Sequence, residues 1–148
     1  MRLPHEVMVF IRRGDEYLVL HRSPAQESYW HTVSGAMEPG ESSSEAAARE
    51  LREETGLDAA AEVVDLHRTF VYPLAEEPES VRARFAPGVT EVMVECFAVE
   101  APCGWEPALD WEHDDYRWCG AEEALELLYW PEPREVLRSL AGRSRPPG

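Results

Sequence analysis

Long hydrophobic runs are missing from this 148-residue sequence. No apolar stretch approaches the roughly 20 residues that a helix needs to cross a bilayer. The N-terminal stretch MRLPHEVMVFIRR reaches its apolar residues at once and then turns charged, which is not the layout of a secretory signal peptide. We therefore expect a cytoplasmic protein that does not act at a membrane.

Cysteine is also scarce, since the chain has only Cys96, Cys103 and Cys119. Their number is odd and no two of them form a CxxC pair. This pattern indicates neither a disulfide framework nor a zinc site. We expect three reduced thiols without a catalytic role.

Basic residues are few, with 14 Lys and Arg against 29 Asp and Glu and a formal net charge of −15. Nucleic-acid binding depends on basic patches that neutralise phosphates, so a nucleic acid is excluded as a partner. A small anionic substrate remains compatible with this charge if a cation stands between it and the carboxylates.

The hydrophobic fraction of 44% and the five tryptophans indicate a globular protein with a packed core. Alternating apolar residues predict strands at 6–13 and 16–22, joined by a turn at Gly14 and Asp15. Helices are expected near both ends of the chain, including two closing ones in 121–142. Strands that interleave with helices favour an α/β (α+β) sandwich. We predict one domain over 1–142 and a disordered tail at 143–148.

The strongest helix signal lies in the segment SSSEAAARELREETG. Ser42 and Glu45 form a capping box, and Gly56 stands where a left-handed residue ends a helix. The sequence therefore predicts a helix over 43–55. A short extended piece is expected before it, around Trp30–Val33.

Three glutamates of this helix, Glu50, Glu53 and Glu54, are spaced at i, i+3 and i+4 and share one face. Like charges at this spacing repel each other by a few tenths of a kcal/mol per exposed pair. A solvated acidic face is one interpretation. The other is a site for Mg²⁺ or Mn²⁺, because hard carboxylate oxygens are the donors that these ions prefer. Glu41 just before the helix adds a fourth carboxylate, and Arg49 is expected to tether the preceding loop through an acid such as Glu38.

These residues resemble the signature of the Nudix family, which constrains nine positions over 23 residues: Gly35-x5-Glu41-x7-Arg49-Glu50-Leu51-x-Glu53-Glu54-x-Gly56-Leu57. The resemblance implies the Nudix fold, a mixed β-sheet sandwiched between helices. It also implies Mg²⁺-dependent hydrolysis, with Mn²⁺ as an alternative, of a nucleoside diphosphate linked to another moiety. The catalytic set that it implies is Glu41, Arg49, Glu50 and Glu53.

The resemblance also implies roles by position. Glu50 and Glu54 are expected to be the principal metal ligands, and Glu53 either a further ligand or the base that activates water. Glu41 is expected to orient the site or to bind metal. The carbonyl oxygen of Ser34 is similar in position to a backbone ligand of the family.

Three further segments, SYWHTVSGAMEPGE, RFAPGVTEVMVECFAV and WEHDDYRW, are similar to the bacterial dihydroneopterin triphosphate diphosphatases, also described as dATP pyrophosphohydrolases. This similarity implies that Glu112 is an additional metal ligand or base, with a plain loop glutamate as the alternative. It suggests Arg22 and Arg84 for phosphate contacts, against surface ion pairing. Trp30 and Phe85 are candidates to stack on a pterin or purine ring, against a place in the core.

The resulting hypothesis is a pyrophosphohydrolase that cleaves a nucleoside or pterin triphosphate to the monophosphate and pyrophosphate. One alternative is the same chemistry on a dinucleoside polyphosphate, ADP-ribose or an oxidised dNTP. Another is a non-catalytic Nudix-fold module, although such modules usually lose the glutamates that are kept here. Segment 73–84 is more acidic and richer in proline than the bacterial group, which leaves the substrate open. A homodimer is compatible with the family.

Overall fold

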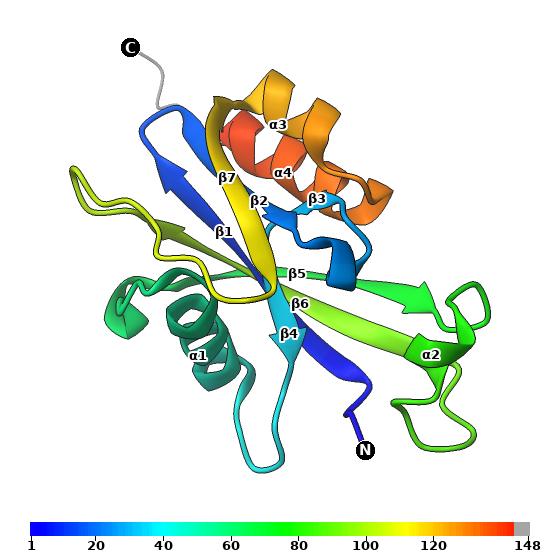
Figure 1. Cartoon of the computed structure of the whole chain (residues 1–148). Coiled ribbons are helices and arrows are strands. Elements are labelled where there is room, and N and C mark those ends of the chain that lie inside the picture. The colour runs from blue at the N-terminus through cyan, green and yellow to red at the C-terminus, as the bar shows by residue number, and fades with distance from the viewer. Residues whose placement is uncertain (144–148) are drawn as a thin grey trace.

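A computed structural model describes residues 1–143, so residues 144–148 of the predicted tail lie outside the described residues. Seven strands form one mixed sheet (Figure 1). In chain order they are β1 (His5–Arg13), β2 (Glu16–Arg22), β3 (Trp30–His31), β4 (Val33–Ala36), β5 (Val64–Pro73), β6 (Glu91–Glu100) and β7 (His113–Gly120). The helices are α1 (Ser43–Thr55), α2 (Glu79–Arg82), α3 (Ala121–Leu127) and α4 (Pro131–Arg143), with short 3-10 turns at Pro24–Gln26 and Ala60–Glu62.

The sheet has the main-path order β3-β2-β1-β6-β5, and β1 lies at its centre. β1 runs parallel to β6 and antiparallel to β2, with which it forms the predicted hairpin. Beside the first half of β1, however, the neighbour is β4, which pairs with residues 6–9. The sheet therefore splits at this point. Because α1 follows β4 after a short loop, the loop and helix of the signature lie beside β4 and β1.

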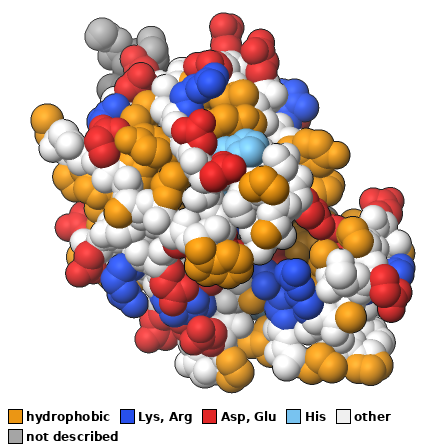
Figure 2. Space-filling model, in the orientation of Figure 1, with side chains coloured by type: hydrophobic (Ala, Val, Ile, Leu, Met, Phe, Trp, Pro, Cys, Tyr) orange, Lys and Arg blue, Asp and Glu red, His pale blue; other side chains and the backbone are white. Residues whose placement is uncertain are grey.

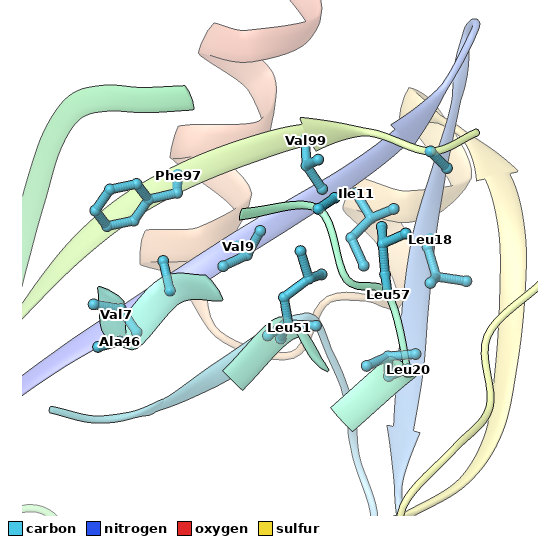
Figure 3. Packing of buried hydrophobic residues seen from close by; sticks show 14 residues of the cluster. Val7, Val9, Ile11, Leu18, Leu20, Ala46, Leu51, Leu57, Phe97 and Val99 are labelled. Atoms are coloured by element: carbon cyan, nitrogen blue, oxygen red, sulfur yellow. The ribbon is translucent and has the colours of Figure 1, made fainter. Parts of the chain in front are cut away.

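Residues on β1 alternate between two cores. Val7, Val9 and Ile11 face α1 and pack with Leu51 and other apolar residues of that side (Figure 3). Met8 and Phe10 face the opposite way, toward apolar residues of α3 and α4. Figure 1 shows α1 on one face of the sheet and α3 with α4 on the other. The predicted mixed sheet between helices is confirmed.

Several local predictions are confirmed, including both hairpin strands and the helix over 43–55. The pairing of β5 with β6 shifts register between Asp65 and Arg68, where His67 has a φ of +52°. The acidic, proline-rich segment 73–84 contains the short helix α2. The three cysteines are free thiols. Within residues 1–143, no helix is both long and apolar enough to cross a membrane.

Candidate active site

The helix α1 is fixed at both ends by its own sequence. The Ser42 hydroxyl accepts a hydrogen bond from the Glu45 amide at 3.1 Å, and the Glu45 carboxylate accepts one from the Ser42 amide at 2.9 Å. Gly56 ends the helix with a φ of +79°, a conformation that favours glycine. These caps fix the register of the helix, and the register decides which glutamates point toward the sheet.

Two of the three helical glutamates are buried and one is exposed. Glu50 is 9% exposed to solvent and Glu54 is 2% exposed, whereas the Glu53 side chain is 54% exposed. Glu54 Oε1 accepts a hydrogen bond from the Ser34 amide at 3.4 Å. The expected gathering of all the carboxylates is therefore incomplete. Within residues 1–143, no three His, Cys, Asp or Glu side chains converge closely enough to hold an ion.

Burial sets the protonation of the inner pair. It raises the pKa of Glu54 well above its usual value, and the neighbouring Glu50 carboxyl raises it further. Burial also raises the pKa of Glu50, although Glu54 and the Arg49 guanidinium oppose this shift. Two neighbouring buried carboxyls are more stable when they share a proton or a cation than when both carry an unbalanced charge.

Gly35 on β4 explains how the backbone comes so close to these carboxyls. A Cβ atom at this position would lie 2.3 Å from the Glu50 carboxyl carbon, so that any side chain would force the Glu50 carboxyl to move. The backbone of β4 and two buried carboxyls thus meet in one place, and Ser34 lines the same cavity. A set of carboxylate and backbone oxygens fits a hard divalent cation such as Mg²⁺.

Arg49 joins the loop to the helix. Its guanidinium donates two hydrogen bonds to Glu41, at 2.7 and 3.0 Å, and one each to Glu50 at 2.8 Å and to the Ala36 carbonyl at 2.9 Å. A longer bond of 3.3 Å goes to Glu53. The expected tether through Glu38 is present as an ion pair of 3.7 Å, but the closer contacts go to Glu41. Glu41 takes this role because it also accepts from the Glu38 amide, and its carboxylate therefore faces the guanidinium.

The end of the loop before β7 and the first residue of β7 add Asp110 and His113, which the sequence did not single out as site residues, beside the predicted Glu112. His113 is fully buried, and its Nδ1 lies 2.8 Å from Asp110 Oδ1. Its Nε2 lies 3.8 Å from Glu54 Oε1 and has no hydrogen-bond partner among the described residues. Glu112 is half-buried and lies 3.7 Å from Arg22. The Asp110-x-x-His113 spacing beside Glu112 was the available signal, but only the fold brings it to Glu54.

A cavity of about 530 Å³ connects these groups to the rest of the pocket. Figure 2 shows basic and acidic side chains close together on the face between α1 and α2. Most of the predicted site residues line the cavity: Arg22, Ser34, Arg49, Glu50, Arg84, Phe85 and Glu112. Glu41 and Glu53 lie outside this lining, and Glu54 is buried.

Trp30 differs from the prediction, because it does not line the cavity. It pairs with His21 across β2 and β3, and its ring contacts the His21 ring at 5.0 Å and the Arg117 guanidinium at 5.5 Å. Side chains alternate along an extended chain, and the neighbouring Tyr29 therefore lines the cavity instead. The Arg22 guanidinium lies 5.5 Å from the Tyr29 ring.

His31 makes the fold sensitive to acid. Burial lowers its pKa to about 3, and nearby Arg22 and His113 contribute. The imidazole of His31 binds a proton near pH 6.5 in the unfolded chain but not in the folded one. The contribution of His31 to the free energy of unfolding is therefore fully present above pH 6.5 and is lost as the pH falls toward 3. The loss is about 1.4 kcal/mol per pH unit. Between pH 6.5 and 5, urea unfolding should show a loss about 2 kcal/mol larger for the wild type than for His31→Gln. Equal losses would exclude His31 as the cause.

Several known proteins are similar in sequence to this chain. The NUDIX domain model matches residues 2–140. An octanoyltransferase from Myxococcus xanthus is 34% identical over 128 residues, and the match covers 85% of this chain but only 33% of that protein. The dihydroneopterin triphosphate diphosphatase of Escherichia coli K12 is 31% identical over 124 residues, which is 82% of this chain and 79% of the relative. The asymmetrical bis(5'-nucleosyl)-tetraphosphatase of Mus musculus is 32% identical, over 83% of this chain and 76% of the relative.

Among solved structures, the dihydroneopterin triphosphate pyrophosphohydrolase of E. coli superposes with a TM-score of 0.82 at 28% identity. The superposition covers 97% of this chain and 98% of that chain. The chain therefore matches this structure over nearly the whole length of both, whereas it spans about a third of the octanoyltransferase.

Proposed function

This chain belongs to the Nudix family, and from that premise we propose that it hydrolyses the triphosphate of a nucleoside or a pterin to the monophosphate and pyrophosphate. The observation that carries the proposal is the buried pair of Glu50 and Glu54 beside a cavity large enough for such a ligand. A polar pair that is costly to bury is expected where charge is needed for binding or chemistry.

Nudix hydrolases generally need a divalent metal ion, and we propose Mg²⁺ for this one. Glu50 and Glu54 would hold it, with the Ser34 carbonyl and Glu53 as further ligands. When bound, such an ion offsets the charge of the phosphates and lowers the pKa of a water molecule. Glu53 lies outside the cavity lining and bonds to Arg49, so its participation requires the side chain to turn inward.

The chain's own groups then have distinct tasks. We assign the acceptance of the water proton to Glu112, because it lines the cavity and Glu53 does not. The water oxygen forms a bond to phosphorus as the bond to the pyrophosphate oxygen breaks. Arg22 and Arg84 line the same cavity and would bind phosphate oxygens. Arg49 does not touch the substrate in this scheme and instead positions Glu41 and Glu50.

A substrate panel tests this proposal. With Mg²⁺ present, dihydroneopterin triphosphate, dGTP, dATP, ADP-ribose and diadenosine tetraphosphate would be compared, and released pyrophosphate and orthophosphate would be measured separately. We expect pyrophosphate from at least one of the triphosphates. Hydrolysis of ADP-ribose or the tetraphosphate alone would contradict the proposal. The Glu54→Gln variant serves as the background control for contaminating hydrolases.

A second candidate is hydrolysis of a dinucleoside polyphosphate. Two features favour it: the similarity to the mouse tetraphosphatase, and aromatic residues at two parts of the cavity wall. Tyr29 and Trp130 form one group, with ring centroids 6.0 Å apart, and Phe70, Tyr72 and Phe85 form the other. Two aromatic groups suit a ligand with two bases. The same panel separates the candidates.

A further inference from the structure

A buried carboxylate lies on the cavity floor and has no part in the chemistry described above. Glu6 is 8% exposed and stands on β1 directly opposite Val94 of β6, which in turn stands opposite Phe70 of β5. All three residues line the cavity, so they form a row across three neighbouring strands. Burying a carboxylate among apolar side chains is costly unless it has partners, and these partners are present.

Two donors hold Glu6 in one orientation. The Tyr72 hydroxyl donates to Oε1 at 2.9 Å, and Arg2 donates to Oε2 through Nε at 3.2 Å and Nη2 at 2.8 Å. Burial, and then the charge of Glu6, raise the pKa of Tyr72, so this hydroxyl stays a donor at neutral pH. Within residues 1–143, Oε1 thus accepts a single hydrogen bond and keeps capacity for another.

The walls around Glu6 are suited to a flat ring. Phe85 is buried, and the Arg2 guanidinium lies 6.0 Å from its ring centroid. The Arg2 amide donates to the Arg84 carbonyl at 2.8 Å, which fixes the N-terminal segment beside this wall. Met8, Phe70 and Val94 complete an apolar surface. In such surroundings an unmade hydrogen bond is expensive, and a polar group therefore discriminates strongly between ligands.

We propose that Glu6 is a specificity-determining residue that selects a ring with a 2-amino-4-oxo edge, as in guanine or a pterin. This inference rests on the proposed function and narrows its substrate class. An ionised carboxylate only accepts hydrogen bonds, so the ring edge that faces it must donate. The 2-amino-4-oxo edge has two adjacent N–H donors. The adenine edge pairs its amino group with an unprotonated nitrogen, whose lone pair would face the carboxylate.

The test compares Glu6→Gln with the wild type. An amide offers both a donor and an acceptor, which matches adenine. We expect the wild type to prefer dGTP to dATP, and the ratio of their kcat/KM values to fall at least about tenfold in Glu6→Gln. Tyr72→Phe, which removes one partner of Glu6, should lower the same ratio by less. Glu95→Gln is the matched control, because Glu95 lies opposite Val7, which faces α1, and pairs with His5.

Three results would overturn the inference: a wild type that prefers dATP, a ratio that stays within twofold in Glu6→Gln, or the same change in Glu95→Gln. A uniform loss on both substrates with a lower Tm would show that Glu6 only anchors the N-terminal segment. The ratio of the equilibrium dissociation constants of GMP and AMP measures the same ring preference without hydrolysis. Ring selection is therefore judged independently of the pyrophosphohydrolase activity.

Discussion

Replacing Glu54 with glutamine is expected to lower kcat/KM by roughly three orders of magnitude and yet to raise the melting temperature of the metal-free protein. The activity falls because a neutral amide cannot balance a divalent cation against the phosphates. The stability rises because burial and Glu50 raise the pKa of Glu54. At neutral pH the folded protein must therefore either take up a proton at Glu54 or bury its charge, and glutamine avoids both costs. A gain of about 1 kcal/mol corresponds to about 2–4 °C.

The measurements are pyrophosphate release and thermal unfolding, each with and without Mg²⁺. Bound Mg²⁺ should raise the melting temperature of the wild type, and the rise should grow as the Mg²⁺ concentration exceeds the Kd. The melting temperature of the variant should respond only weakly. Glu62→Gln is a suitable control, since Glu62 is exposed and lies on a short turn after α1. A variant that keeps the wild-type rate, or that unfolds at a lower temperature, would contradict the assignment.

Glu53→Gln gives the companion measurement. The Glu53 carboxylate is half exposed and accepts a hydrogen bond of 3.3 Å from Arg49. We expect kcat to fall here as well, but the metal-free stability should not rise, because little repulsion is relieved. Opposite stability changes in the two variants would separate the buried glutamate from the exposed one.

The helix and the identity of its acidic residues could be predicted because the signals are local. The capping box of Ser42 and Glu45 and the glycine at 56 fix the register through contacts a few residues apart. Which of these carboxylates is buried and which is exposed could not be predicted from local signals. Glu54 is buried because the sheet splits beside β1, and Glu53 turns toward Arg49, which depends on tertiary packing.

Residues from distant segments were the harder part to predict. His113 and Asp110 reach Glu54 across more than fifty positions of the chain, and no local pattern specifies that approach. The choice between Trp30 and Tyr29 depends on one step of strand register, which sets the face that a side chain occupies. The sequence pattern pointed to Trp30, whereas the adjacent Tyr29 is the aromatic residue that lines the cavity.

Replacing Arg49 with alanine is the second change with a large expected effect, and here stability and activity should fall together. The guanidinium is 14% exposed and joins Glu41, Glu50 and the loop carbonyl of Ala36. Its removal leaves the buried Glu50 and the partly buried Glu41 without a cationic partner, which costs about 3 kcal/mol. The loop between β4 and α1 also loses its tether, so kcat/KM should fall at least about a hundredfold.

Arg49→Lys separates charge from geometry. An ammonium group keeps the charge but cannot bind Glu41 through two parallel hydrogen bonds while also bonding to Glu50 and Ala36. We expect urea unfolding to show partial recovery of stability and the kinetics to show little recovery of activity. Arg52→Ala, on an exposed position of the same helix, should change either quantity only slightly. Full activity in Arg49→Lys would mean that charge alone matters, and the positioning role of the guanidinium would have to be abandoned.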